Sequence, residues 1–466
     1  MDDTLRGMNE RIRTLRGQSE ETAPRISLER ARLITEAYRE HGGKVSVPVM
    51  RALAFANVMA RKHICISEGE LIVGERGEGP QMAPTYPELC CHTLQDMEIM
   101  HQRDKISFRV SDADMAIQQA EIIPYWRGRS IRDHMFRLMT REWIDCYEAG
   151  IFTEFMEQRA PGHTVADDKI YRIGFLELIA RIEERIRELD FYNDPAAAGK
   201  HEQLKAMGIA AEAIMTLARR CAARARELAA VESDPTRHQE LLDIAETCQH
   251  VPAYAPRTFR EALQAYWFVH LGVITELNTW DAFNPGRLDQ HLYPFYAREV
   301  AAGSLDREQA RELLQCFWVK FNNQPAPPKV GITLQESGTY TDFANINIGG
   351  LTPDGGDGVN DVSYLLLEVI GDMRLLQPSS NIQVSKRNPD HFIHKAGEVI
   401  RQGWGQPSVF NADAVVEELL RQGKSLRDAR MGGTSGCVET GAFGKEAYIL
   451  TGYFNLVKAL EITLNN

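Results

Sequence analysis

A glycine-rich stretch at residues 432–441, GGTSGCVETG, carries the pair of residues best suited to chemistry. Its glycines disfavour regular helix or strand, permit positive φ and allow a ligand to approach the backbone closely. Cys437 and Glu439 lie two residues apart, so in an extended loop both side chains can lean toward one pocket. A neighbouring carboxylate raises the pKa of a thiol, which would make Cys437 a poor thiolate nucleophile. The pair suits hydrogen-atom transfer, with the sulfur as a radical and the carboxylate moving a proton; a buried cysteine in a structural loop is the alternative interpretation.

Two further stretches place polar side chains beside Pro-Gly turns. Residues 157–164, EQRAPGHT, present His163 from a loop, where it serves either as an acid–base group or as a structural hydrogen-bonding residue. Residues 280–289, WDAFNPGRLD, combine two carboxylates, an arginine and two aromatics. Within this stretch Asp281 can act on a substrate, cap a helix or pair with Arg287.

Motifs of several other enzyme classes are missing from the sequence. It contains no GxxxxGK[ST], strand-linked GxGxxG, GxSxG or HExxH motif. The eight cysteines include no CxxC pair, so the sequence argues against zinc and iron–sulfur sites, and we expect no bound metal. Residues 353–358 lack the spacing and the final glutamate of a calcium-binding loop and are predicted to form a solvated turn.

The composition limits the class of protein. The 466 residues are 44% hydrophobic and 25% charged, which is typical of a folded globular chain and excludes a disordered one. The formal net charge of -12 argues against nucleic acid or an anionic membrane surface as a partner. No apolar run reaches the roughly 18–20 residues that span a bilayer, and the N-terminus lacks an apolar signal segment. These features predict a cytoplasmic protein with reduced cysteines.

Helical periodicity dominates residues 1–250, whereas short extended segments enter in residues 251–466. This alternation predicts an α/β fold with functional residues at strand ends. Residues 258–261 have the form of a capping box that opens a largely buried helix. The other predicted helices are 27–41, 203–231, 237–248, 306–322, 359–374, 389–402, 413–422 and 455–464. The predicted extended segments are 329–333, 346–349, 381–384 and 407–410.

The sequence around the cysteine resembles the active-site signature of the glycyl radical enzymes, the family that includes pyruvate formate-lyase. Gly436-Cys437-Val438-Glu439 carries this resemblance. With the threonine that follows Glu439, the motif is similar to that of the subgroup that dehydrates trans-4-hydroxy-L-proline. The similarity extends over essentially the whole chain. It includes residues 74–76, 83–87, 158–164, 280–283, 321–328 and 452–453.

The resemblance implies a fold and a cofactor. The fold is one pyruvate formate-lyase-type domain over residues 1–466, a ten-stranded α/β barrel of two antiparallel half-barrels surrounded by helices. The catalytic cysteine would lie on a loop inside this barrel. The resemblance also implies an oxygen-sensitive glycyl radical, which a separate S-adenosylmethionine-dependent activating enzyme with an iron–sulfur cluster installs, and a homodimer.

The resemblance also implies roles for individual residues in a radical dehydration of trans-4-hydroxy-L-proline to 1-pyrroline-5-carboxylate and water. Cys437 would carry the thiyl radical and Glu439 would act as a general base. His163 and Asp281 would lie near the departing hydroxyl. The residues that would hold the proline ring and its carboxylate are Ser337, Phe343 and Tyr453.

The sequence departs from the family in the segment that stores the radical. Family members carry the radical glycine near their C-terminus in an Arg-Val-x-Gly-aromatic pattern, whereas this sequence has only Arg109-Val110-Ser111-Asp112. Family members also continue well past the position of Asn466. We therefore expect the chain to match the N-terminal part of the family, without the glycyl radical domain, and the isolated chain to be inactive.

Three other functions are compatible with the sequence. The first is a glycyl radical enzyme with a diol, glycerol or choline substrate, which a pocket without partners for a carboxylate and an amine would favour. The second is a non-catalytic fragment, or one half of a split enzyme that binds a partner. The third is a thiol hydrolase, which the sequence supports least, because no Cys, His and Asn residues occur in that order within supporting local motifs.

Overall fold

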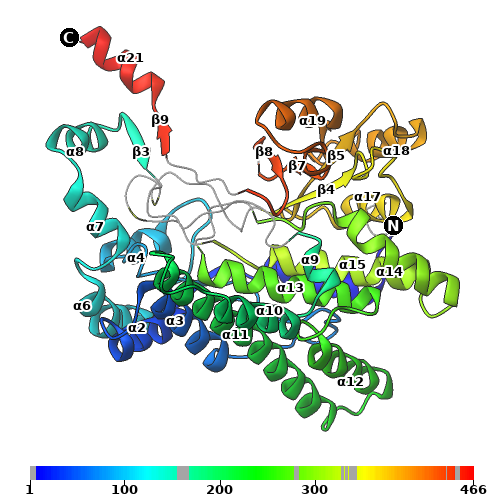
Figure 1. Cartoon of the computed structure of the whole chain (residues 1–466), viewed down its shortest axis with the longest axis horizontal. Coiled ribbons are helices and arrows are strands. Elements are labelled where there is room, and N and C mark those ends of the chain that lie inside the picture. Colours follow the sequence, from blue (N-terminus) through cyan, green and yellow to red (C-terminus); the bar gives the residue numbers. More distant parts are fainter. Residues whose placement is uncertain are drawn as a thin grey trace.

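The computed structural model describes residues 7–154, 167–277, 283–326, 330, 334, 344–436, 438–446 and 452–465. This part of the chain is mixed α/β, as the sequence predicts. Figure 1 shows a layer of long helices below and a small sheet with flanking helices at the upper right. The strands among the described residues form one three-stranded sheet and three two-stranded ribbons, so the ten-stranded barrel stays a prediction.

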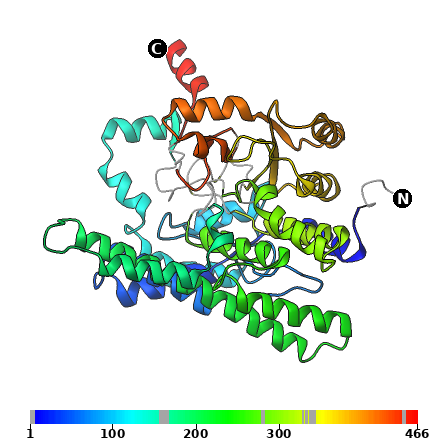
Figure 2. The same cartoon turned by 45° about the vertical axis from the view of Figure 1, so that its right-hand side comes forward.

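The helical layer comes mainly from the first half of the chain. α11 and α12 lie side by side along its lower edge (Figures 1 and 2), and α11 also packs on α3 and α10. The helices described before residue 251 are α1 (Glu10–Glu21), α2 (Glu29–His41), α3 (Val47–Arg61), α4 (Leu94–Gln102), α5 (Asp112–Ile117), the π-helical turn η2 (Gln118–Ile122), α6 (Ile123–Trp126), α7 (Ile131–Leu138), α8 (Arg141–Glu148), α9 (Lys169–Arg172), α10 (Phe175–Arg187), α11 (Ala197–Ala229) and α12 (Pro235–His250).

Of these helices, α2 and α11 differ at their starts from the predicted bounds, and α12 begins two residues earlier than predicted, at Pro235. The helix predicted from residue 27 begins at Glu29, because β1 (Arg25–Ser27) pairs in parallel with β2 (Met82–Pro84) and takes Ser27 into a sheet. The helix predicted from residue 203 begins at Ala197 and continues to Ala229. Pairing with a distant segment decided the first start, and hydrophobic periodicity contains no information about that segment.

Helix α13 (Phe259–Glu276) is buried on all sides and joins two hydrophobic cores. Phe259, Leu263 and Trp267 pack in the core that contains the sheet, whereas Phe268 and Leu271 pack in the core with α11 and α12. A helix that is hydrophobic all round is stable only when neighbours cover every face. α13 therefore fixes the sheet-bearing half of the molecule on the helical layer.

The capping box predicted at the start of α13 forms only in part. The Thr258 hydroxyl oxygen accepts a hydrogen bond from the Glu261 backbone N–H at 3.1 Å, as predicted. The Glu261 carboxylate, however, accepts from the backbone N–H and the guanidinium of Arg257, at 2.6 Å each. The arginine one residue before the cap competes for this carboxylate because it offers a charged donor as well as a backbone one.

The parallel sheet has the order β4-β5-β6 and follows the predicted extended segments. Its strands are β4 (Asn345–Gly349), β5 (Ser379–Val384) and β6 (Ser408–Asn411). Ile346, Ile348 and Ile382 face the hydrophobic core, so alternate residues with amide side chains lie on the opposite face. The extended segment predicted at 329–333 lies almost entirely outside the described residues, and residues 353–358 form the predicted turn.

Helices connect and cover these strands. The remaining helices are α14 (Leu288–Ala302), α15 (Arg307–Asn322), α17 (Asp361–Met373), α18 (Asp390–Ile400), α19 (Ala412–Arg421), α20 (Leu426–Arg430) and α21 (Leu456–Asn465). The remaining strands are β3 (Phe152–Glu154), β7 (Gly432–Thr434), β8 (Thr440–Ala442) and β9 (Gly452–Phe454). β3 pairs with β9 in an antiparallel ribbon, from which α21 extends away from the other helices at the upper left of Figure 1.

A buried ion pair ties α2 to the end of α13. The Arg30 guanidinium binds both carboxylate oxygens of Glu88, at 2.6 and 3.2 Å, and donates to the Thr275 carbonyl at 2.6 Å. Arg30 and Glu88 are only 2% and 3% exposed. Removal of one partner from such a pair leaves the other charge buried and poorly compensated.

We predict that Glu88→Gln lowers the free energy of unfolding by about 3–5 kcal/mol, because it leaves the Arg30 charge without a counterion. Urea denaturation followed by circular dichroism measures this. The matched control is Glu36→Gln, which breaks the exposed pair between Glu36 and Arg61 and should cost about 1 kcal/mol or less. Equal losses of unfolding free energy in the two variants would show that the buried pair stabilises the fold no more than the exposed pair does.

Candidate functional site

The glycine-rich stretch forms a tight hairpin. β7 and β8 pair in antiparallel register, with Gly432 opposite Ala442 and Thr434 opposite Thr440. The Ser435 N–H donates to the Glu439 carbonyl at 2.8 Å and closes the loop between the strands. The prediction that this stretch avoids regular strand is therefore wrong at both of its ends. The strands form because the loop ends are close enough to make cross-strand hydrogen bonds.

The glycines of β7 are explained by close packing. A Cβ atom on Gly432 would lie 2.7 Å from the Gly441 carbonyl oxygen and would also collide with Leu419. A Cβ atom on Gly433 would lie 2.6 Å from the Asn347 side-chain oxygen. Neither glycine has a positive φ. The expectation that their conformational freedom is needed is therefore corrected, because the sheet and α19 approach the backbone too closely for any side chain.

An asparagine of the sheet pairs with β7 as a neighbouring strand would. The Thr434 N–H donates to Asn347 Oδ1 at 3.0 Å, and Asn347 Nδ2 donates back to the Thr434 carbonyl at 2.8 Å. Asn347 is completely buried. Its amide therefore satisfies a buried peptide unit that would otherwise lose hydrogen bonds to water.

Arg287 holds the same hairpin from the other side. Its Nε donates to the Gly432 carbonyl at 3.0 Å, its Nη1 to Gly349 at 2.7 Å and its Nη2 to Arg430 at 3.1 Å. Burial lowers the pKa of Arg287 to about 10, so the guanidinium stays charged at neutral pH. Its hydrogen-bond partners in the described part of the chain are carbonyls that end β4 and α20 and begin β7. The alternative in which Arg287 pairs with Asp281 involves a residue outside the described part.

Asp289, in the first turn of α14, supports the arrangement. Its carboxylate accepts from the Gly349 N–H at 2.7 Å, the Ser363 hydroxyl at 2.5 Å and the Gln290 N–H at 2.9 Å. Burial raises the pKa of Asp289, and the Ser363 and Gly349 donors oppose that shift. This carboxylate joins α14 and α17 to the end of β4. The sequence marked residues 280–289 as notable, but it offered Arg287 only as a partner of Asp281 and assigned no role to Asp289.

The sequence matches the pyruvate formate lyase-like family over residues 8–466. The chain belongs to this family. It is 59% identical over 461 residues to trans-4-hydroxy-L-proline dehydratase from Clostridioides difficile, a match that covers 99% of this chain and 58% of that protein. These findings confirm the resemblance seen around Cys437.

Solved structures give the same relationship. The structure resembles hydroxyproline dehydratase from Clostridioides difficile with trans-4-hydroxy-L-proline bound, with a TM-score of 0.95 and 58% identity, over 99% of this chain and 58% of that one. It also resembles the glycerol-bound, B12-independent glycerol dehydratase from Clostridium butyricum, with a TM-score of 0.92 and 30% identity, over 100% of this chain and 59% of that one. The chain thus spans a little under three fifths of the length of these relatives.

Two of the predicted site residues lie among the residues that the structure describes. Glu439 is exposed in the hairpin loop, where its carboxylate accepts from the Val438 N–H at 3.2 Å. Tyr453 is on β9, in a different ribbon, with 62% of its surface exposed. The predicted site residues outside the described part are Cys437, His163, Asp281, Ser337 and Phe343.

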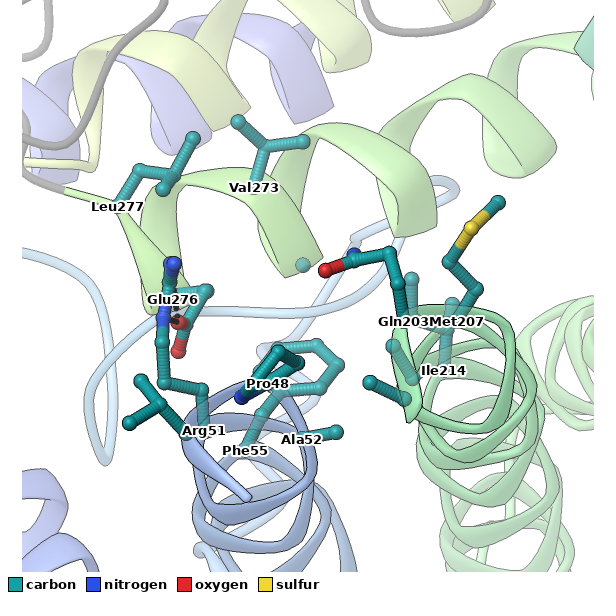
Figure 3. Close-up of a pocket in the computed structure, with 14 residues that line it drawn as sticks. Pro48, Arg51, Ala52, Phe55, Gln203, Met207, Ile214, Val273, Glu276 and Leu277 are labelled. Atoms are coloured by element: carbon teal, nitrogen blue, oxygen red, sulfur yellow. Dashed lines mark hydrogen bonds and ion pairs between the residues drawn. The ribbon is translucent and has the colours of Figure 1, made fainter. Parts of the chain in front are cut away.

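A cleft of about 400 Å³ lies between α3, α11 and α13 (Figure 3). Apolar side chains such as Phe55, Met207 and Val273 make up most of its lining. Arg51 and Glu276 provide charge there, but they bind each other at 2.8 Å. An amino-acid substrate needs partners for its amine and carboxylate, so the chemistry of this cleft does not match one.

Two searches of the described residues bear on metals and membranes. Within the described ranges, no three or more His, Cys, Asp or Glu side chains group as metal ligands. No described helix is long and apolar enough to cross a membrane.

We predict that Gly432→Ala lowers the free energy of unfolding by about 1–3 kcal/mol, because the added methyl group meets the Gly441 carbonyl and Leu419. The control is Gly397→Ala in α18, where an added Cβ has no neighbour within 4 Å. That change should raise the stability by about 0.5–1 kcal/mol through helix propensity. Thermal and urea denaturation measure both, and a neutral Gly432→Ala would contradict the packing explanation.

Proposed function

We propose that this chain carries the cysteine loop of a glycyl radical enzyme that dehydrates trans-4-hydroxy-L-proline to 1-pyrroline-5-carboxylate. The main support is the 59% identity over 99% of the chain to a dehydratase of that substrate. Identity to isethionate sulfite-lyase from Nitratidesulfovibrio vulgaris is 30% over a similar span. A relationship twice as close, over the same elements, favours the hydroxyproline substrate over others used in the family.

In the proposed reaction the family's glycyl radical would supply the unpaired electron, and Cys437 is the residue of this chain that would carry it to the substrate as a thiyl radical. The Cys437 sulfur then abstracts a hydrogen atom from C5 of the substrate, where the ring nitrogen stabilises the resulting carbon radical. The C4 hydroxyl is adjacent to that radical and leaves as water once His163 or Asp281 protonates it. Glu439 accepts the proton from the ring nitrogen as the C5–N double bond forms. The C4 radical regains a hydrogen atom from Cys437, so the net change is loss of one water.

The described geometry is compatible with these roles. Val438 is 71% exposed and Glu439 is also exposed. This side of the hairpin loop is therefore accessible to a ligand or to another polypeptide segment. Ser337, Phe343 and Tyr453 hold the ring and carboxylate in this proposal. The proposal also includes one domain over residues 1–466, a radical-installing S-adenosylmethionine-dependent activating enzyme, a homodimer and a cytoplasmic location.

We predict that Cys437→Ser abolishes turnover, because an alcohol O–H bond is too strong to replace the thiol. Glu439→Gln should keep substrate binding but lower kcat about 10²–10⁴-fold through loss of a proton acceptor. The measurement is anaerobic formation of 1-pyrroline-5-carboxylate after activation, with the chain completed by the remaining segment of its family. Turnover by Cys437→Ser, or turnover of glycerol, a diol or choline in place of hydroxyproline, would contradict the proposal.

The surface of α21 supports a contact with the part of the family that this chain does not match, which is the contact that one half of a split enzyme would use. Leu456, Val457 and Leu464 are 74%, 77% and 73% exposed, and Leu460 is 57% exposed. Both views show α21 at the outer edge of the molecule (Figures 1 and 2). Clustered large apolar side chains on one exposed helix mark an interaction surface. The proposed partner is the polypeptide that corresponds to the unmatched part of the dehydratase.

We predict that this polypeptide, made from the Clostridioides difficile dehydratase, binds the chain in a 1:1 complex during sedimentation. Leu460→Glu should weaken the complex at least about tenfold, because it places a charge in an apolar contact. Val231→Glu, at an 80% exposed position after α11, is the control and should bind as the unmodified chain does. Absence of a complex would rule out the split-enzyme function.

A further inference from the structure

One face of the sheet is made of amide side chains. Asn345 and Asn347 alternate along β4, and Asn381 and Gln383 alternate along β5. All four are at most 3% exposed. Burial of four amides is unfavourable unless their donors and acceptors find partners, so their mutual arrangement must be specific.

Three of these amides form a chain of hydrogen bonds with one direction. Gln383 Nε2 donates to Asn381 Oδ1 at 2.8 Å, and Asn381 Nδ2 donates to Asn345 Oδ1 at 2.9 Å. Because each oxygen accepts from the preceding amide, the nitrogen of the same amide must point onward. The orientations of Asn381 and Asn345 are therefore each set by the amide that precedes them in the chain.

The chain ends on the hairpin loop. Asn345 Nδ2 donates to the Gly436 carbonyl at 2.7 Å. That carbonyl belongs to the peptide unit between residues 436 and 437. Asn345 therefore holds the loop at Gly436, the residue that precedes Cys437 in the sequence.

We propose that this amide chain, through Asn345, positions Cys437 for hydrogen-atom transfer. The inference rests on the proposed radical function of Cys437. Asn345 is a positioning residue, because it acts on the loop backbone and not on the substrate. The amides hold the loop at Gly436 without adding a further formal charge beside the sulfur. A displacement of about 1 Å between reacting atoms can cost about 10²-fold in rate.

The first test needs no substrate and no radical. Hydrogen exchange of residues 435–439 is followed by mass spectrometry in Asn345→Ala and in the unmodified chain. We expect exchange about fivefold faster or more in the variant, the loss expected for one hydrogen bond. The control is Asn57→Ala, which removes a 2.7 Å bond from an amide to the Leu33 carbonyl in the helical layer. It should leave exchange of residues 435–439 unchanged.

A second variant tests transmission along the chain without touching the loop carbonyl. Asn381→Leu keeps a side chain of similar shape but removes the donor to Asn345 Oδ1, the bond through which the chain reaches Asn345. We expect faster exchange of residues 435–439 here too, by a smaller factor than in Asn345→Ala. The positioning role is wrong if both variants fold and exchange at residues 435–439 is as slow in them as in Asn57→Ala.

The last measurement separates positioning from simple structural support. In the completed and activated enzyme, Asn345→Ala should lower kcat about tenfold or more with KM nearly unchanged. The kinetic isotope effect with substrate deuterated at C5 should rise, because hydrogen transfer becomes slower than other steps. An unchanged isotope effect would overturn the role in hydrogen transfer. Faster exchange in a chain that does not dehydrate hydroxyproline would keep the loop contact and reject the proposed function.

Discussion

The central constraint on this structure is that a glycine hairpin buried against a sheet must have its peptide groups satisfied. Gly432 and Gly433 of β7 cannot carry side chains, because the sheet and α19 lie too close to their backbone. Its carbonyls and N–H groups therefore depend on side chains from elsewhere. Asn347 serves the Thr434 peptide in both directions, and Arg287 serves the Gly432 carbonyl. Without these side chains, the buried peptide groups of β7 would lack hydrogen-bond partners, which destabilises the fold.

The donors are in turn fixed by larger elements. Arg287 directly precedes α14, whose first turn contains Asp289, and that carboxylate holds the end of β4 and the start of α17. α14 and α17 pack in the same core as one side of α13. The other side of α13 lies on α11 and α12. The long helices thus support the cysteine loop through a short sequence of rigid contacts, which is how a site gains precision from a scaffold.

Much of the local structure was predictable. The helices from α12 to α19 that were expected begin and end within a few residues of their predicted bounds, and β4, β5 and β6 follow three predicted extended segments. The cysteine motif was sufficient to indicate the family, which residues 8–466 confirm. Periodicity carries this information because helix and strand expose different faces of a sequence to the core. The roles of His163, Asp281, Ser337 and Phe343 stay predictions, since they lie outside the described residues.

The sequence by itself determined the helices, the three parallel strands, the family and the pairing of a cysteine with a carboxylate two residues away. Only the tertiary structure decided why Gly432 and Gly433 are glycines, where β1 displaces the start of α2 and which groups hold the cysteine loop. The reason is that these features depend on contacts between residues far apart in the chain. Asn345 and Gly436 are 91 positions apart, and Arg287 and Gly432 are 145 apart. Local patterns contain the propensity of each segment, but not the neighbour that each segment meets.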